Sequence, residues 1–241
     1  MTAPRLPADL AATIVDPTAH ADPGRLHGAF TRMRANHPLA VAEVEGCEPF
    51  WAVSKHADIL DISKQNAMFP SGVKATTFTT IAATEQVMKL TGTPHMVRSL
   101  VQMDPPDHSK YRVLTQSWFL PQNLRKLEPR LRQLAKTYVD RMADKGGSCD
   151  FVADVAVWYP LRVIMDILGV PEADEPRMLK LTQELFAPTD PELSRKGTAG
   201  GFDTLKSDEA VAAMQATVMD FFQYFNAITE DRRAHPRDDV A

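Results

Sequence analysis

The residues best suited to binding chemistry lie between Met103 and Pro121, in the segment MDPPDHSKYRVLTQSWFLP. His108 and Arg112 are four positions apart, so a helix would place both on one face, with Phe119 further along that face. Two potential cations beside an aromatic ring could hold an anionic group that also has an apolar body. For an arbitrary helix, an exposed pair that contacts nothing is the simpler alternative.

The same segment carries the signals that begin and end a helix. Asp104 can cap free backbone amides, Pro105 suits the first helical position, and Asp107 falls in the favourable first turn. Pro121 should end the helix, because proline lacks a backbone donor and clashes with the preceding turn. We therefore predict one helix between these limits.

Composition argues against several classes of function. The 241 residues are 44% hydrophobic and 24% charged, as in ordinary globular proteins, and the net charge of −4 argues against nucleic-acid binding. No apolar run approaches the roughly 18 residues that span a bilayer, and the N-terminus does not resemble a signal peptide. Cys47 and Cys149 form no CxxC pair, which fits a reducing compartment. We therefore expect a cytoplasmic protein that binds neither membrane nor nucleic acid.

Hydrophobic periodicity predicts a mainly α-helical protein with a small β-hairpin. Residues 1–21 contain three prolines and are interpreted as an irregular arm, and Pro23 begins the first helix behind a capping acid. The runs 39–44 and 50–53 form the hairpin, and Ser54 is expected to cap the next helix. Further helices are predicted over about 81–90, 124–144, 152–168, 174–186 and 205–233. The absence of βαβ alternation and of a glycine-rich phosphate loop argues against a doubly wound nucleotide enzyme.

The segment from Met103 to Pro121 resembles helix C of the soluble bacterial cytochromes P450, which are heme-thiolate monooxygenases. Three further segments resemble the same family in the same order. They are WAVSKHADILDISKQNAMFPSG (second β1 strand, helix B and the following turn), YPLRVIMDILGVPEADEPRMLKLTQELF (helices E and F) and DRRAHPRDDVA (end of helix G and the approach to helix I). The resemblance implies that residues 1–241 are the N-terminal part of a single cytochrome P450 domain, helices A to G, ending before the central I helix.

The family's iron-binding parts have no counterpart in this sequence. The oxygen-activating helix with its acid–Thr pair, the Glu-x-x-Arg helix and the loop with the proximal cysteine are missing. Neither Cys47 nor Cys149 has the family's Phe-x-x-Gly…Cys-x-Gly surroundings, so neither is assigned to iron. Histidines outside the helix C segment, such as His95, show no metal-ligand spacing and are interpreted as ordinary surface or core residues. We therefore expect no catalytic residue and no metal ligand in this stretch.

The resemblance implies an enzyme that is complete only with a C-terminal half. Such a monooxygenase binds heme b, takes electrons from a ferredoxin and uses O₂ to hydroxylate a small apolar substrate. The sequence most resembles the terpineol-hydroxylating branch, whose members act on monoterpenes or small aromatic hydrocarbons. The alternative is a truncated helical fragment or interaction module without redox activity, which would expose the apolar faces meant for the missing helices.

The family's pattern also implies roles for individual residues. His108 and Arg112 match its heme-propionate pair, and Phe119 lies either near the heme edge or in the core. Segment 66–102 is too long for an ordinary connection, and it matches the roof of the substrate pocket; a mobile surface loop is the alternative. Its apolar substrate-binding candidates are Phe78, Met96, Val97, Leu100 and Val101.

Two more regions match functional parts of the family. Leu185, Phe186 and the loop 187–202 correspond to the substrate lid between helices F and G, although a plain connection between helices would also fit. The glycines that would provide hinge freedom are Gly197, Gly200 and Gly201. A run of five basic residues could dock an acidic ferredoxin, although a solvated helix face is the default interpretation. The run consists of Arg125, Lys126, Arg130, Arg132 and Lys136. The docking candidates are Arg125 and Lys126 of this run, together with Lys110.

Overall fold

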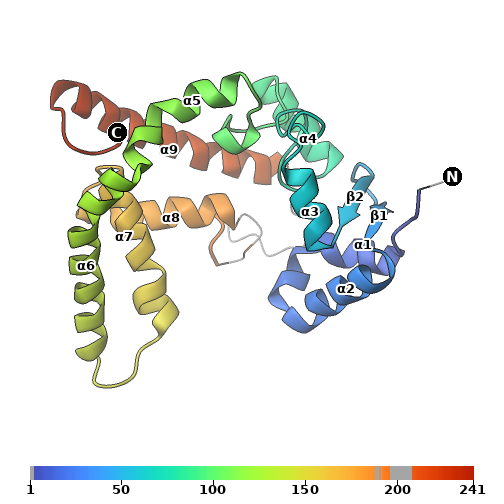
Figure 1. Ribbon diagram of the computed structural model, residues 1–241, viewed down its shortest axis with the longest axis horizontal. Coiled ribbons are helices and arrows are strands. Elements are labelled where there is room, and N and C mark those ends of the chain that lie inside the picture. The colour runs from blue at the N-terminus through green and yellow to red at the C-terminus, as the bar shows by residue number, and fades with distance from the viewer. Residues whose placement is uncertain (1–2, 188–189, 191, 196–207) are drawn as a thin grey trace. The chain divides into compact units, whose positions relative to one another are not determined.

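The structure, a computed structural model, describes residues 3–187, 190, 192–195 and 208–241 (Figure 1). Its internal contacts divide the chain into two compact units, which are described separately. Unit 1 comprises residues 1–108 and 184–218, and unit 2 comprises residues 109–183 and 219–241. The described residues are mainly helical, with a two-stranded antiparallel sheet, which confirms the predicted fold class.

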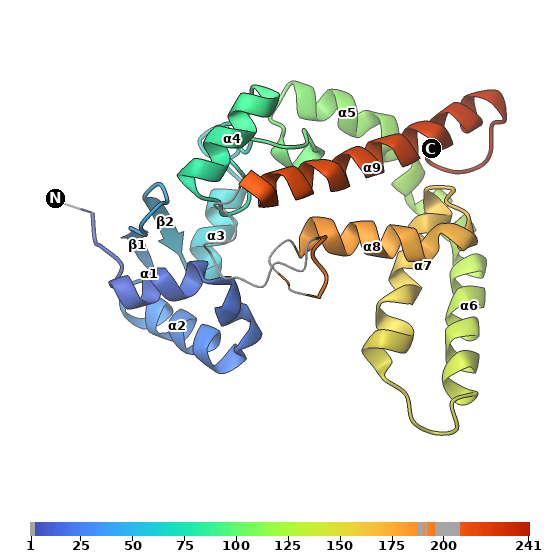
Figure 2. The same ribbon diagram turned by 180° about the vertical axis from the view of Figure 1, so that it is seen from behind.

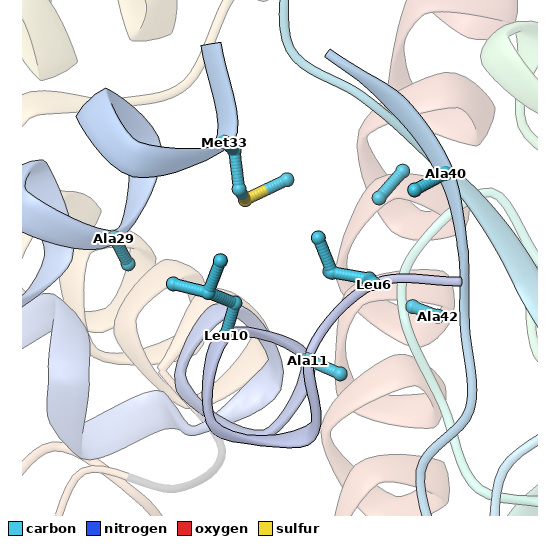
Figure 3. Packing of buried hydrophobic residues seen from close by; sticks show 8 residues of the cluster. Leu6, Leu10, Ala11, Ala29, Met33, Ala40 and Ala42 are labelled. Atoms are coloured by element: carbon cyan, nitrogen blue, oxygen red, sulfur yellow. The ribbon is translucent and has the colours of Figure 1, made fainter. Parts of the chain in front are cut away.

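The N-terminal residues are built into the core of unit 1, so the prediction of an irregular arm was wrong. Helix α1 (Ala8–Val15) is followed by a 3₁₀ turn, η1 (Pro17–Ala21). Leu10 is 2% exposed and packs with Met33 of α2 (Pro23–Asn36) and Ala40 of β1 (Leu39–Ala42). Figure 3 shows these side chains converging from three elements. Pro7 and Pro17 lie at the starts of α1 and η1, where their missing N–H groups cost nothing.

The hairpin of unit 1 matches its prediction. Strand β1 pairs with β2 (Phe50–Val53), with Leu39 opposite Val53 and Ala42 opposite Phe50. The predicted start of α2 is also confirmed. The Asp22 carboxylate caps the helix by accepting a hydrogen bond from the Arg25 amide at 3.0 Å.

Helix α3 (His56–Ser63) begins later than expected. The Ser54 hydroxyl donates to the Pro38 carbonyl at 3.3 Å, and the N-cap residue of α3 is Lys55, whose side chain makes no capping bond among the described residues. Ser54 therefore secures the end of the hairpin rather than the start of a helix. Helix α4 (Ile81–Thr91) lies where predicted, and the Thr80 hydroxyl caps it by accepting the Ala83 amide at 3.1 Å.

Unit 2 is built from long amphipathic helices. Helix α6 (Pro121–Ala143) buries Leu134 and Tyr138, and it lies beside α7 (Trp158–Ile167), as both views show (Figure 1, Figure 2). A π-helical turn, η4 (Val152–Ala156), leads into α7. The core of unit 2 forms where α7 meets parts of α8 (Glu175–Phe186) and α9 (Asp208–Ala234). Its buried residues are Leu161, Met165, Val170, Met178, Leu181 and Tyr224.

Helix α5 (Asp107–Gln116) ends before Pro121, and a 3₁₀ turn, η3 (Ser117–Phe119), separates it from α6. The prediction of one continuous helix from the Asp-Pro-Pro signal to Pro121 was therefore too long. Among the described residues, no helix is both long and apolar enough to cross a bilayer.

Candidate cofactor and substrate site

The start of α5 differs from the sequence prediction. Asp104 and Pro105 precede the helix, and the Pro105–Pro106 peptide bond is cis. A residue that precedes proline avoids the helical conformation, which explains why Pro105 cannot occupy the first turn. The Asp104 carboxylate instead binds the Ser71 amide at 2.9 Å and the Gly72 amide at 2.8 Å. These two bonds lower the pKa of Asp104.

His108 and Arg112 both lie on α5, four residues apart, so they share one face as predicted. His108 is half-buried and Arg112 is exposed. Within the part of the chain that the structure describes, Arg112 has no ion-pair or hydrogen-bond partner. Phe119 belongs to η3 and is 52% exposed, so it does not continue the α5 face as the single-helix prediction required.

The surroundings of Arg112 fit one edge of a heme but not its iron. Helix α5 exposes apolar side chains, with Val113 62% and Leu114 72% accessible. An unpaired guanidinium on a helix with uncovered apolar surface suits a carboxylate carried by an apolar ring system. Cys47 is buried in unit 1 and Cys149 is half-buried in unit 2. The described residues also contain no cluster of three or more His, Cys, Asp or Glu suited to a metal ion.

The proposed roof segment is partly packed and partly open. Met96, Val97 and Leu100 are half-buried, whereas Val101 is 72% exposed. Phe78 packs edge-to-face on Phe50 of the hairpin, with 5.3 Å between ring centroids. A substrate contact by these side chains stays a prediction.

Within the lid region the structure describes residues 185–187, 190 and 192–195. At the end of α8, Leu185 is half-buried and Phe186 is 79% exposed. The predicted hinge residues Gly197, Gly200 and Gly201 lie outside the described residues.

The basic run on α6 divides into paired and unpaired residues. Arg130 binds Asp166 at 2.7 Å, and i,i+4 pairs link Arg132 to Glu128 and Lys136 to Asp140. Arg125 and Lys126 are exposed and have no ion-pair partner among the residues described here. Lys110 is also exposed.

Sequence reasoning missed a cluster in unit 1 formed by Gly72, His95 and Asp104. His95 is 6% exposed, and its Nε2 lies 3.1 Å from the Gly72 carbonyl oxygen. The sequence prediction places Asp104 at a helix start and treats His95 as an ordinary histidine. For Asp104 the available signal was the Asp-Pro-Pro run. The second proline disfavours the helical conformation at Pro105, so Asp104 lies before the helix and its carboxylate can bind elsewhere.

Comparison with known proteins finds relatives along nearly the whole chain. No family model matches the sequence. The chain is 41% identical over 237 residues to cytochrome P450-terp of a Pseudomonas species, a match that covers 98% of this chain and 54% of that protein. It is 30% identical over 209 residues to cytochrome P450(MEG) of Priestia megaterium, covering 87% of this chain and 46% of that protein.

Solved structures give the same result. CYP108D1 of Novosphingobium aromaticivorans matches with a TM-score of 0.82 at 38% identity, covering 99% of this chain and 54% of its own. CYP268A2 of Mycobacterium marinum, solved in complex with pseudoionone, matches with a TM-score of 0.75 at 26% identity over the same shares. The helices and the small sheet are thus those of a cytochrome P450 fold. The chain belongs to the cytochrome P450 family and corresponds to its N-terminal half, spanning about half the length of these relatives.

Proposed function

We propose that this chain is the N-terminal half of a cytoplasmic, heme-dependent monooxygenase that hydroxylates a small apolar substrate with O₂ and electrons from a ferredoxin. In this proposal residues 1–241 form part of a single domain. The observation that carries the proposal is Arg112, an exposed guanidinium without an ion-pair partner in the described part of the chain. It lies one helical turn from His108, on a helix that also exposes Val113 and Leu114.

The residues of this chain would hold and orient the heme b edge. When bound, heme supplies the oxygen chemistry, while the protein supplies binding, orientation and exclusion of water. Arg112 would bind a propionate through paired, charge-assisted hydrogen bonds, each worth about 1.5–3 kcal/mol. His108 would donate a ring N–H to the same edge, and Phe119 would cover apolar surface beside it. The iron ligand is expected outside these residues.

The proposed substrate is a monoterpene or a small aromatic hydrocarbon. Such a molecule offers no charge, so its binding would come from apolar burial, on the order of 25 cal/mol per Å². The candidates in the roof segment are Phe78, Met96, Val97, Leu100 and Val101, and those at the lid are Leu185 and Phe186. Met96, Val97 and Leu100 are half-buried, so the roof segment already packs against other residues of the protein. This packing supports the proposed role of the segment.

The proposed ferredoxin site consists of Lys110, Arg125 and Lys126. Arg125 and Lys126 support it because they are exposed and unpaired in the described chain, whereas Arg130, Arg132 and Lys136 are paired with acids. Unpaired surface charge steers an oppositely charged partner and raises the association rate more than the final affinity.

A helical interaction module without redox activity is the second candidate. The observation that favours it is the apolar surface that unit 2 leaves uncovered. Its large exposed side chains include Val113, Leu114, Leu120, Leu124, Val139 and Phe222. Exposed apolar surface of this kind usually binds a partner or leads to aggregation.

One spectroscopic experiment separates the two functions. The protein is produced from the whole reading frame that contains these residues, reduced and exposed to carbon monoxide. The monooxygenase should give the absorption band of thiolate-bound heme, and monoterpenes or small aromatics should shift its spin state. A protein that purifies without heme and gives no such band would contradict the proposed function and favour the interaction module.

A further inference from the structure

Gly72 makes a hydrogen bond through each of its backbone polar groups, and the two partners lie nine residues apart in the sequence. Its N–H donates to the Asp104 carboxylate at 2.8 Å. Its carbonyl oxygen lies 3.1 Å from Nε2 of His95. Because a carbonyl can only accept, His95 must carry a proton on Nε2 and donate it. The segment between His95 and Asp104 is therefore bound to Gly72 at both ends.

The Asp104 end is bound twice. One carboxylate oxygen accepts the Ser71 amide at 2.9 Å, and the other accepts the Gly72 amide. Hydrogen bonds to an ionised acceptor are stronger than neutral ones. A Cβ on Gly72 would lie 3.0 Å from an Asp104 carboxylate oxygen and 3.2 Å from the Gln102 carbonyl oxygen. This close approach explains why a residue without a side chain occupies the position.

The His95 end depends on a buried ring. His95 is 6% exposed, and its Nδ1 has no hydrogen-bond partner among the described residues. Burying a polar group without a partner is unfavourable, so the Nε2 bond to Gly72 is the polar interaction that favours this placement of the ring. His95 lines a cavity of about 380 Å³, together with Gly72, Arg98 and Asp104.

The segment also has internal order. Residues Leu100–Gln102 form a 3₁₀ turn, η2, whose start is closed by a capping box between Ser99 and Gln102. Arg98 pairs with Asp107 at the start of α5. The turn therefore fixes the backbone of Leu100 and Val101 between the two bound ends.

We propose that His95 and Asp104 are positioning residues for the substrate site. We call the hydrogen bonds that join these two residues to Gly72 the Gly72 clamp. The clamp holds segment 96–103, and with it Met96, Val97, Leu100 and Val101, in one position. Neither residue needs to touch the substrate. Their role is to limit the size of the substrate by keeping the segment from moving outward. The substrate role rests on the proposed function, whereas the clamp itself rests on geometry alone.

Hydrogen–deuterium exchange in the protein from the whole reading frame tests the clamp. His95→Phe keeps the ring but removes the donor, and His95→Gln can return an N–H near the position of Nε2. Amides in 96–103 should exchange about five- to tenfold faster in His95→Phe than in wild type, and His95→Gln should restore most of the protection. His56→Phe, which changes an exposed histidine of α3, is the matched control and should leave this segment unchanged. Equal exchange in wild type, His95→Phe and Gly72→Ala would overturn the clamp.

Substrate spin-shift titration tests the positioning role. Dissociation constants are measured for a short and a long hydrocarbon in wild type and in the two His95 variants. Loss of the clamp should move the ratio of the two constants toward one in His95→Phe, with recovery in His95→Gln. Faster exchange with an unchanged ratio would overturn the positioning role and leave the clamp as structure only. A missing thiolate-heme band in wild type would instead refute the proposed function, and the exchange result would still decide whether the clamp exists.

Discussion

Arg162 of α7 binds Glu175 at the start of α8, with 2.8 Å between Nη1 and Oε1, and both side chains are about nine-tenths buried. Arg162 also pairs with Asp166 one turn further along α7. Asp166 in turn accepts a hydrogen bond from Arg130 of α6, with 2.7 Å between Arg130 Nε and Asp166 Oδ2. Burial by itself raises the pKa of Asp166, but the bonds from Arg130 and Arg162 outweigh it and lower the pKa below its ordinary value. Arg162 and Asp166 of α7 thus form ion pairs with charged residues of both α6 and α8 in unit 2.

Arg162→Met should destabilise the protein strongly. The substitution leaves buried Glu175 without a cation, and Asp166 keeps only Arg130. Removing one partner of a buried ion pair costs about 3–5 kcal/mol. Urea unfolding followed by circular dichroism measures the change. Arg132→Met is the matched control, because its pair with Glu128 is exposed and i,i+4 pairs are worth about 0.3–0.5 kcal/mol. Similar losses in both variants would contradict the structural role of Arg162.

Leu10→Ala tests whether α1 belongs to the core of unit 1. Leu10 is 2% exposed, so the substitution should cost about 2–5 kcal/mol through lost burial and the cavity that it leaves. Leu60→Ala, at a position that is 43% exposed, should change the free energy of unfolding by less than about 0.5 kcal/mol. If both substitutions were equally mild, the N-terminal residues would be a loose arm after all.

The helices with a complete local signal were predictable from sequence. The α2 start needed only Asp22 and Pro23. The α6 stripe, from half-buried Leu131 to buried Leu134 and Tyr138, repeats with the period of a helix. The α1 helix was missed because its flanking prolines suggested an irregular arm, although proline is tolerated where a helix begins. The hydroxyl of Ser54 was misassigned because its partner, Pro38, lies 16 residues earlier in the chain.

The candidate site was predictable in residue types but not in its supporting contacts. The four-residue spacing of His108 and Arg112 is enough to place both side chains on one face of a helix. The partners of Asp104 lie more than 30 residues earlier, and no periodicity connects them. Pairing between distant loops depends on the folded backbone, so the role of His95 at Gly72 could not be read from local patterns.

Acid titration should reveal the ionised Asp104 carboxylate. The Ser71 and Gly72 amides hold the pKa of Asp104 below its ordinary value of 3.8 in the folded state. A lowered folded pKa means that the stabilisation is complete above the unfolded value and is lost as the pH falls through the folded pKa. The stability difference between wild type and Asp104→Asn should therefore be constant near neutrality and should shrink below pH 3.8. Urea unfolding at a series of pH values measures it, and a difference independent of pH would contradict the assigned bonds.

Arg112→Ala should weaken heme retention far more than Lys126→Ala. Both residues are exposed, basic and without an ion-pair partner in the described chain, so the two substitutions remove the same charge. They differ in position, because Arg112 shares the α5 face of His108, whereas Lys126 lies on α6. Loss of a charge-assisted bond to a propionate should raise the heme dissociation constant about ten- to a hundredfold.

Transfer of heme to an excess of a heme-scavenging protein measures this difference in the product of the whole reading frame. Arg112→Lys refines the result, because lysine keeps the charge but cannot make the paired bonds of a guanidinium. Retention between that of wild type and Arg112→Ala would indicate that bond geometry, and not charge alone, holds the propionate. Equal heme loss from Arg112→Ala and Lys126→Ala would show instead that α5 contributes only general positive potential, and the propionate assignment would be wrong.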